Sequence, residues 1–383
     1  MSPQPVNGGP PPSLDLDEWK RTADPSADGL INGLFARGQA RLLNALLESL
    51  DHPESAPAPA HEALAAFLRS ATLPVWAEPE RILRAQRLFL RHGPAFGVVL
   101  MLSSLPVLYA GAFGGSQILA MTGQLTKNFR RRASETLRFI LDAMEPGGLN
   151  PEGKGVKATR KVRLMHATVR QFAQGAGWSA HPDWGQPINQ EELAGTLLAF
   201  SSVALDGLRK LGIAVDGGEQ EDYLHAWKCI GFVLGVREEC LPADMASARM
   251  LWQRIGRRNF RRTPEGLALM QAHLEFVKEL LPGHAEGLLI ESLLRFLMGK
   301  QVACAILGLP KASWADFFLN WIRFLLRLDG LWIFKGRVMN RVLEGLSREL
   351  MESLYKFWHE GGPPPFRMPT SLAAEPGQGG PVG

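Results

Sequence analysis

Residues 160–170 read Arg-Lys-Val-Arg-Leu-Met-His-Ala-Thr-Val-Arg, and this run predicts a helix with a single histidine, His166. Residues three and four positions apart share a helix face, so Arg163 and Arg170 lie on either side of His166. Two guanidinium groups disfavour a further positive charge, and we therefore expect the imidazole to be neutral. A neutral imidazole binds metal ions, and arginine binds carboxylates such as haem propionates. The pattern suggests haem, although such a histidine is more often a surface or core residue without a ligand.

A helical hairpin is predicted around this run. Residues 126–143 place four apolar residues in one stripe, namely Phe129, Ala133, Leu137 and Ile140. Arg132 and Thr136 lie four residues apart on an adjoining face. Residues 144–157 are rich in glycine and proline, which predicts a loop. The chain then returns antiparallel to the preceding helix, so Thr136 and His166 are expected to face the same object.

The pattern Arg132-x-x-x-Thr136, followed by Arg163-x-x-His166, resembles the haem-binding signature of the latex clearing protein (rubber oxygenase) and MpaB-type oxygenase family. The interval from Thr136 to His166 is 166 − 136 = 30 residues, as in that family. The similarity extends over about residues 75–335. Further segments in the family's order are 122–125 (Thr-Gly-Gln-Leu), 185–190 (Gly-Gln-Pro-Ile-Asn-Gln), Phe200-Ser201, 223–227 (Tyr-Leu-His-Ala-Trp) and 234–236 (Leu-Gly-Val).

The resemblance implies an all-α fold with a globin-like core around a b-type haem, and dioxygen-dependent cleavage of carbon–carbon double bonds in isoprenoid chains. His166 would be the proximal ligand to the haem iron. Arg163 would hold the His166 segment and the haem carboxylates. Arg132 and Thr136 would lie on the haem and pocket side of the preceding helix.

Two departures from the family pattern concern the distal side. The rubber-cleaving enzymes have a lysine just before the threonine, where it can occupy the distal iron position, and this chain has Glu135. Near Ser116 and Gln117 the acidic pocket residue of those enzymes is missing. Both departures argue against polyisoprene as the substrate and leave the haem site in place. Glu135, Arg132 and Thr136 are the predicted catalytic residues, with Glu135 as a polar group near the open face.

Composition excludes several classes of protein. Hydrophobic residues make up 46% and charged residues 21% of the 383 residues, which is typical of a globular protein with a core. The net charge of +4 gives no case for nucleic-acid binding, and the arginine-rich stretches 130–132 and 254–262 are interpreted as solvated or propionate-facing helix surfaces. Three cysteines argue against a disulfide framework. The sequence contains no Cys-x-x-Cys-His for covalent haem attachment, and no serine-hydrolase, phosphate-loop or zinc-helix motif.

Helical periodicity without strand alternation runs along the whole chain. We expect an N-terminal tail over 1–14, a helical extension over 15–74, a haem-binding oxygenase domain over 75–360 and a C-terminal tail over 361–383. The N-terminus has no basic region followed by an apolar core, so no secretory signal is visible and a cytoplasmic protein is expected.

Two apolar regions raise the question of a membrane. Residues 93–121 contain no charge, and their glycines and prolines favour two buried helices broken near 111–115 over a membrane span. Residues 314–334 contain several aromatic residues, interrupted by Arg323 and Arg327. They are interpreted as interhelix packing. The alternative is an apolar channel or a peripheral membrane contact for a lipid substrate.

The sequence therefore predicts a haem oxygenase whose partners are dioxygen and an apolar isoprenoid or lipid-like molecule. The alternative is a helical protein that binds haem or lipid without turnover. His225 is the second choice for the iron ligand and is interpreted as structural, because no arginines accompany it. His181, next to Pro182 in a loop, is the third choice.

Overall fold

The computed structural model describes residues 15–121, 129–280 and 284–311, and these residues form helices and no strands. The all-α prediction is thus confirmed. Gly111 and Phe260 form an isolated β-bridge. The α-helices are α1 (Leu16–Arg21), α2 (Pro25–Ala36), α3 (Leu43–Glu48), α4 (His61–Ser70), α5 (Pro79–Arg91), α6 (Gly93–Val99), α7 (Leu105–Val107), α8 (Gly115–Met121), α10 (Phe129–Met144), α11 (Lys154–Gly175), α12 (Gln190–Phe200), α13 (Ser202–Lys210), α14 (Gly217–Val233), α15 (Met245–Asn259), α16 (Pro264–Leu280) and α17 (His284–Met298).

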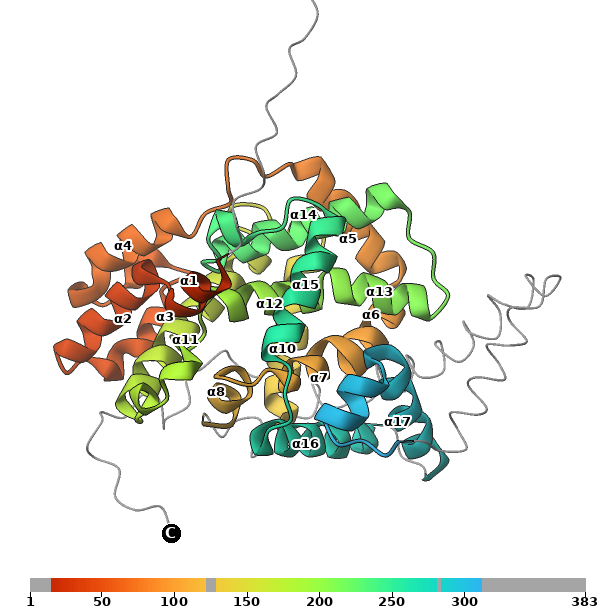
Figure 1. Cartoon of the computed structure of the whole chain (residues 1–383). Coiled ribbons are helices and arrows are strands. Elements are labelled where there is room, and N and C mark those ends of the chain that lie inside the picture. The colour runs from red at the N-terminus through yellow and green to blue at the C-terminus, as the bar shows by residue number, and fades with distance from the viewer. Residues whose placement is uncertain (1–14, 122–128, 281–283, 312–383) are drawn as a thin grey trace, which may run out of the picture.

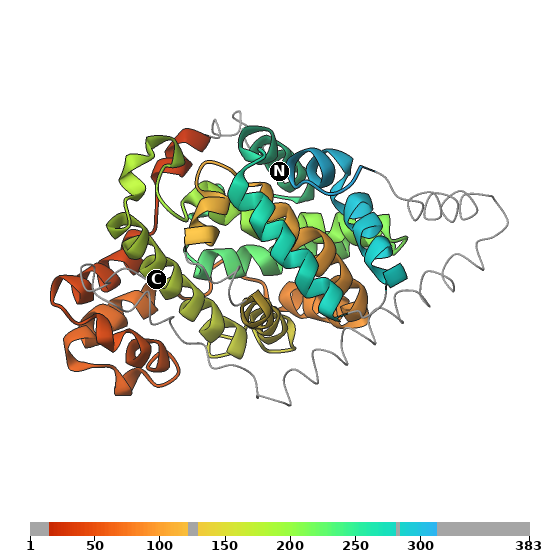
Figure 2. The ribbon, with the colours of Figure 1, turned by 90° about the horizontal axis from the view of Figure 1, so that it is seen from below.

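The N-terminal helices α2, α3 and α4 gather at one end of the molecule, beside α11 (Figures 1 and 2). Their leucines form a core of their own, which is closed by Leu164, Met165 and Ala167 of α11. These three residues surround His166 in the sequence. The extension therefore packs against the back of the helix that contains the predicted ligand. The boundary at residue 74 stays a prediction.

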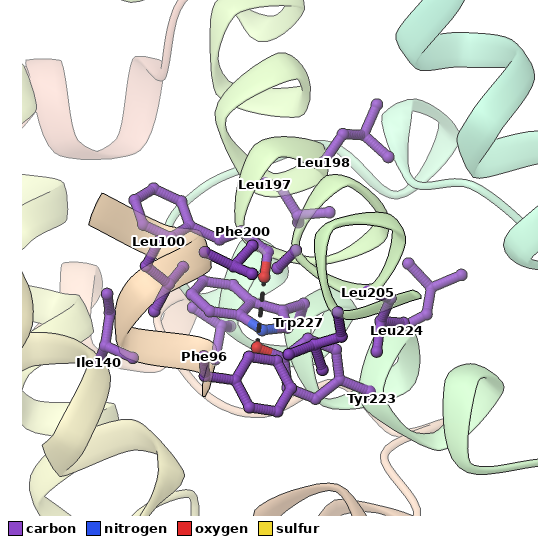
Figure 3. Packing of buried hydrophobic residues seen from close by; sticks show 14 of the residues in the cluster. Phe96, Leu100, Ile140, Leu197, Leu198, Phe200, Leu205, Tyr223, Leu224 and Trp227 are labelled. Atoms are coloured by element: carbon purple, nitrogen blue, oxygen red, sulfur yellow. Dashed lines mark hydrogen bonds between the residues drawn. The ribbon is translucent and has the colours of Figure 1, made fainter. Parts of the chain in front are cut away.

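The main core surrounds α12, which lies at the centre of the molecule and packs against α1, α13, α14 and α15 (Figure 1). Aromatic side chains fill this region, and Phe200 stacks on Trp227 with ring centroids 5.3 Å apart. The buried Tyr223 hydroxyl donates to the carbonyl oxygen of Phe200 at 3.3 Å (Figure 3). This bond satisfies a polar group that would otherwise destabilise the core.

The charge-free run of residues 93–121 forms two helices, as predicted. The first continues from α6 through a π-helical turn at Leu100–Ser104 into α7 and a 3₁₀ turn at Leu108–Ala110. Residues 93–110 are long and apolar enough to cross a membrane, and 72% of this segment is buried inside the fold. The chain breaks where Phe113 and Gly114 adopt positive φ values of 56° and 122°, and α8 follows.

The helical periodicity of the sequence runs without interruption through two stretches that are each divided in the structure. The stretch 31–50 breaks after α2, where Gly38 has a φ of 65°. The stretch 189–211 breaks at Ser201, whose backbone angles of −105° and −88° are not helical, and α13 begins at the next residue. The aromatic region 314–334, interpreted from the sequence as interhelix packing, lies outside the described residues.

Candidate active site

The predicted hairpin of α10 and α11 is present, and glycine makes its tight return possible. A Cβ on Gly148 would lie 2.0 Å from the carbonyl oxygen of Asp142, and one on Gly155 would lie 2.5 Å from Cα of Ala143. Real Cβ atoms do not approach other atoms so closely, so only glycine fits at either position. The close packing sets the adjoining faces of α10 and α11 against one cavity.

This cavity has a volume of about 340 Å³ and is lined by α10, α11, α12, α14, α15 and residues 105–119. Such a volume is within the range of small-molecule sites. Four of the five predicted site residues line it, namely Arg132, Glu135, Thr136 and His166. Most of the wall is apolar. It includes Leu105, Leu108, Ile118, Leu119, Phe129, Phe139, Val162, Val169, Leu197, Phe200, Trp227, Ile230, Trp252 and Ile255.

His166 offers a neutral ring to the cavity. Burial, together with the charges of Arg170 and Arg132, lowers the pKa of its imidazole to about 3. Its Nδ1 atom is buried, and the described part of the chain provides no hydrogen-bond partner for it. Buried polar groups are normally paired, so a ring that lines a cavity without a partner is a candidate for ligand binding.

Arg132, Glu135 and Thr136 form one hydrogen-bonded group on α10. Both carboxylate oxygens of the buried Glu135 accept, one from Arg131 Nε at 3.0 Å and the other from Arg132 Nη1 at 2.9 Å. The Thr136 hydroxyl donates to the carbonyl oxygen of Arg132 at 2.9 Å. Arg132 Nη1 also lies 3.6 Å from the sulfur of Met165, so this group touches the His166 helix. Glu135 therefore fixes the guanidinium of Arg132 at the cavity wall.

Arg163 is the predicted site residue that the structure places elsewhere. Its Nε and Nη2 donate to the two carboxylate oxygens of Asp24, at 2.7 and 2.9 Å, and its Nη1 donates to the carbonyl oxygens of Ser70 and Val233. All of these partners lie away from the cavity. The geometry supports the expected role of holding the His166 segment, whereas it shows no contact with the cavity that a carboxylate-binding role would need.

Arg170 likewise points to the N-terminal extension. It donates to Asp28 at 2.6 Å and to the carbonyl oxygen of Ile188 at 3.3 Å. Both arginines that flank His166 in the sequence are therefore paired with α2 or its N-cap residue Asp24. They anchor α11 to the N-terminal extension, and Arg170 in addition helps to keep the His166 ring neutral.

The other two histidines considered as ligands do not line this cavity. His225 Nε2 accepts from the backbone N–H of Glu78 at 3.0 Å, and its ring packs edge-on against Trp76. The structural interpretation of His225 is thus confirmed. His181 is exposed and stacks on Trp184, with ring centroids 3.8 Å apart.

Sequence analysis missed a second set of polar residues that line the same cavity: Lys20, Glu191, Glu192 and Asn259, here called the polar cluster. The two glutamates follow the N-cap Asn189 of α12, and acids are common in that position, so the sequence gives no sign of a site. Lys20 belongs to α1 and Asn259 ends α15. Only the tertiary fold brings these three helices together.

Burial also controls the charges of the polar cluster. It raises the pKa of Glu192 to about 8, so that this carboxyl is mostly protonated at neutral pH. It also raises the pKa of Glu191, which accepts from Asn259 Nδ2 at 2.7 Å and lies 3.4 Å from Arg258 Nε. The ammonium of Lys20 lies 4.9 Å from the centre of the Phe113 ring, and burial lowers its pKa. The break in the apolar run is close by, since a Cβ on Gly114 would lie 2.9 Å from Glu192 Oε1.

Comparison with known proteins identifies a family that matches most of this sequence. Residues 83–351 match the family described as ER-bound oxygenase mpaB/B'/Rubber oxygenase, catalytic domain. The chain belongs to this family. It is an oxygenase, and the resemblance inferred from the Arg132, Thr136, Arg163 and His166 pattern is confirmed.

Two relatives support the assignment. The oxygenase is 27% identical over 293 residues to the rubber oxygenase of Streptomyces sp. (strain K30), an alignment that covers 75% of this chain and 71% of the relative. Its fold is similar to that of latex clearing protein LCP in the closed state, with a TM-score of 0.70, 21% identity, and coverage of 88% of this chain and 91% of the other. The family match begins at residue 83, so α1 and Lys20 precede the matched segment.

Proposed function

We propose that this oxygenase binds a b-type haem through His166 and oxidises, or cleaves, a carbon–carbon double bond of an apolar isoprenoid-like substrate. The observation behind the proposal is a neutral, unpartnered imidazole on the wall of a mainly apolar cavity. The printed name of the Streptomyces relative, rubber oxygenase, supports a substrate of this class.

The residues present fit a haem. A neutral ring can give its lone pair to iron, and His166 is neutral at physiological pH. Within the described ranges, no three His, Cys, Asp or Glu side chains form a group that could hold a metal ion. A porphyrin brings four nitrogen ligands of its own and needs only an axial ligand from the protein. Arg132 is the cavity-lining arginine that would receive a propionate, because arginine matches carboxylate geometry.

A bound haem would supply the activation of dioxygen, and the protein supplies position and environment. His166 would hold the haem on the α11 side of the cavity. Glu135 orients Arg132 through a 2.9 Å hydrogen bond, and the hydroxyl of Thr136 is kept within the α10 group. The apolar side chains of the wall exclude water and hold an alkene without competing hydrogen bonds. Glu135, Arg132 and Thr136 therefore remain the proposed catalytic residues.

The decisive experiment is the absorbance spectrum of the purified protein, with and without dithionite and carbon monoxide. We expect a Soret band that shifts on reduction and carbon monoxide binding. His166→Ala should abolish the band while far-UV circular dichroism stays helical, because the ring is replaced at a cavity wall. His225→Ala is the matched control and should keep the band, since His225 pairs with Glu78 outside the cavity. Full haem retention in His166→Ala would reject the ligand assignment.

Oxygen uptake with squalene or short polyisoprenes tests the reaction itself. We expect uptake that depends on both the alkene and His166. Uptake that ignores the alkene would contradict the proposed substrate class even if the spectrum showed haem.

A further inference from the structure

The polar cluster is a feature that a pure hydrocarbon substrate does not use. Lys20, Glu191, Glu192 and Asn259 share the cavity with His166 and with the apolar wall. We propose that this cluster binds the hydroxyl group of an isoprenoid alcohol, whose apolar chain extends along the rest of the cavity. The inference rests on the proposed function and specifies its substrate class.

Asn259 points most directly to a ligand. The residue is 9% exposed, and its Oδ1 atom is buried and lacks a hydrogen-bond partner among the described residues. Its Nδ2 donates to Glu191 Oε1 at 2.7 Å. A buried acceptor without a donor destabilises a protein, so a ligand hydroxyl that donates to Oδ1 would relieve the defect.

The rest of the cluster selects among polar groups. A hydroxyl can donate to Asn259 and at the same time accept from the ammonium of Lys20 or from the protonated carboxyl of Glu192. An ether can accept but cannot donate. A phosphate or carboxylate has no proton for Asn259 at neutral pH and would face Glu191, so an anionic head group is disfavoured. A hydrocarbon would leave Asn259 Oδ1 without a donor.

Burial of Glu192 supports this selection, because its pKa of about 8 leaves the carboxyl able to donate at neutral pH. Lys20 lies outside the segment that matches the family, and backbone hydrogen bonds to that segment hold it in place. Its carbonyl oxygen accepts from Gln186 N at 3.0 Å, and Thr22 O accepts from Gln190 N at 2.9 Å. These bonds connect α1 to the loop before α12 and to the first residue of α12. Glu191 and Glu192 follow in the first turn of α12. The hydroxyl site thus requires the N-terminal extension.

Isothermal titration calorimetry of the full-length holoprotein with farnesol, farnesyl methyl ether and farnesyl phosphate tests the proposal without turnover. We expect farnesol to bind about tenfold more tightly than the ether, because the ether leaves Asn259 Oδ1 unpaired. Farnesyl phosphate should bind more weakly than farnesol. Equal affinities for farnesol and the ether, or tighter binding of the phosphate, would overturn the proposal.

Variants locate the effect. Asn259→Leu should reduce the ratio of farnesol to ether affinity to about one, because it removes the acceptor. Ile255→Val, one helical turn earlier on α15 and also in the cavity wall, should weaken both ligands and leave the ratio unchanged. If Asn259→Leu does not fold, Lys20→Met provides a second test and should lower the ratio by weakening farnesol more than the ether. An unchanged ratio in the folded variant would overturn the assignment.

The two proposals can fail separately. A protein with the Soret band but no preference for farnesol would retain the haem function and lose the alcohol site. A protein without the band that still prefers farnesol would lose the haem function and keep the alcohol site.

Discussion

The cavity has two polar regions, one on the α10 and α11 side around His166 and the other at the polar cluster. They differ in where their charged side chains find partners. On the α10 and α11 side, the buried arginines behind His166 pair with Asp24 and Asp28 of the N-terminal extension. On the side of the polar cluster, Lys20, Glu191 and Glu192 all line the cavity itself. In the first region, Arg163 and Arg170 are paired with aspartates of the N-terminal extension, and Arg132 is paired with Glu135 at the cavity wall. The His166 imidazole beside them has no partner for Nδ1 among the described residues. In the polar cluster, the residues with hydrogen-bonding groups line the cavity.

Burial is the largest cause of the protonation states of His166 and Glu192. Burial disfavours the charged form of any group, so it lowers the pKa of a base and raises that of an acid. His166, with a pKa of about 3, and Glu192, with a pKa of about 8, are therefore both neutral near pH 7. A neutral base can bind a metal, and a neutral acid can donate a hydrogen bond. The same dry cavity suits the two regions to different ligands.

The largest expected effect concerns the support behind His166. Arg163→Ala leaves the carboxylate of Asp24, whose side chain is 4% exposed, without its guanidinium. Breaking a buried ion pair in this way should lower the free energy of unfolding by about 3 kcal/mol or more. Urea denaturation followed by circular dichroism measures it, and haem content after gel filtration should fall in parallel.

Arg170→Ala is the control for that experiment. Asp28 is 21% exposed and can be hydrated when its partner is removed, so the loss of stability and of haem should be smaller. Equal losses in the two variants would show that Arg163 has no special role in holding α11.

A middle-sized effect is expected at Gly114, which borders the polar cluster. Its φ of 122° is unfavourable for any side chain, and a Cβ would lie 2.9 Å from Glu192 Oε1 and 3.1 Å from the carbonyl oxygen of Trp184. Gly114→Ala should lower the free energy of unfolding by about 2 kcal/mol.

Gly177→Ala is the control that distinguishes the cost of a positive φ from the cost of the close contacts at Gly114. Gly177 also has a positive φ, of 87°, with no atom within 4 Å of the added Cβ, so the loss should be nearer 1 kcal/mol. If thermal or urea unfolding gave the same loss at both positions, close contact with Glu192 would have no measurable cost.

The last expected effect is a change in pH dependence at Glu192. Its pKa is about 8 in the folded protein and near 4.5 when unfolded, so between these values the folded state binds the extra proton. The contribution of Glu192 to stability is therefore greatest at low pH and falls as pH rises toward about 8. Lys20 and Glu191 face this carboxyl, and their charges do not change the direction.

Glu192→Gln removes that slope. Relative to the parent protein, the variant should gain stability as pH is raised from about 5 to about 8.5 in urea unfolding series. Glu62→Gln, on an exposed turn of α4, is the control and should show no such trend. Parallel curves for Glu192→Gln and the parent would mean that this carboxyl is ionised throughout the range.

Local sequence patterns were enough to predict the helical class, the α10 and α11 hairpin and the placement of Thr136 and His166 on one cavity, because helix periodicity and glycine-rich turns are local properties. The sequence also identified the family through the spacing of Arg132, Thr136 and His166. It could not assign the direction of Arg163, since Arg163 and Arg170 are equivalent helix neighbours of His166 until the acid that pairs with each is known. Asp24 lies 139 residues away from Arg163 in sequence.

The polar cluster was decided only by the tertiary structure. Glu191 and Glu192 are ordinary first-turn acids in the sequence, and Lys20 and Asn259 are 239 positions apart, because 259 − 20 = 239. Their role depends on a shared cavity wall and on the loss of water there, which shifts the pKa values of Lys20, Glu191 and Glu192. Burial is a property of the assembled fold, and no local pattern of residues encodes it.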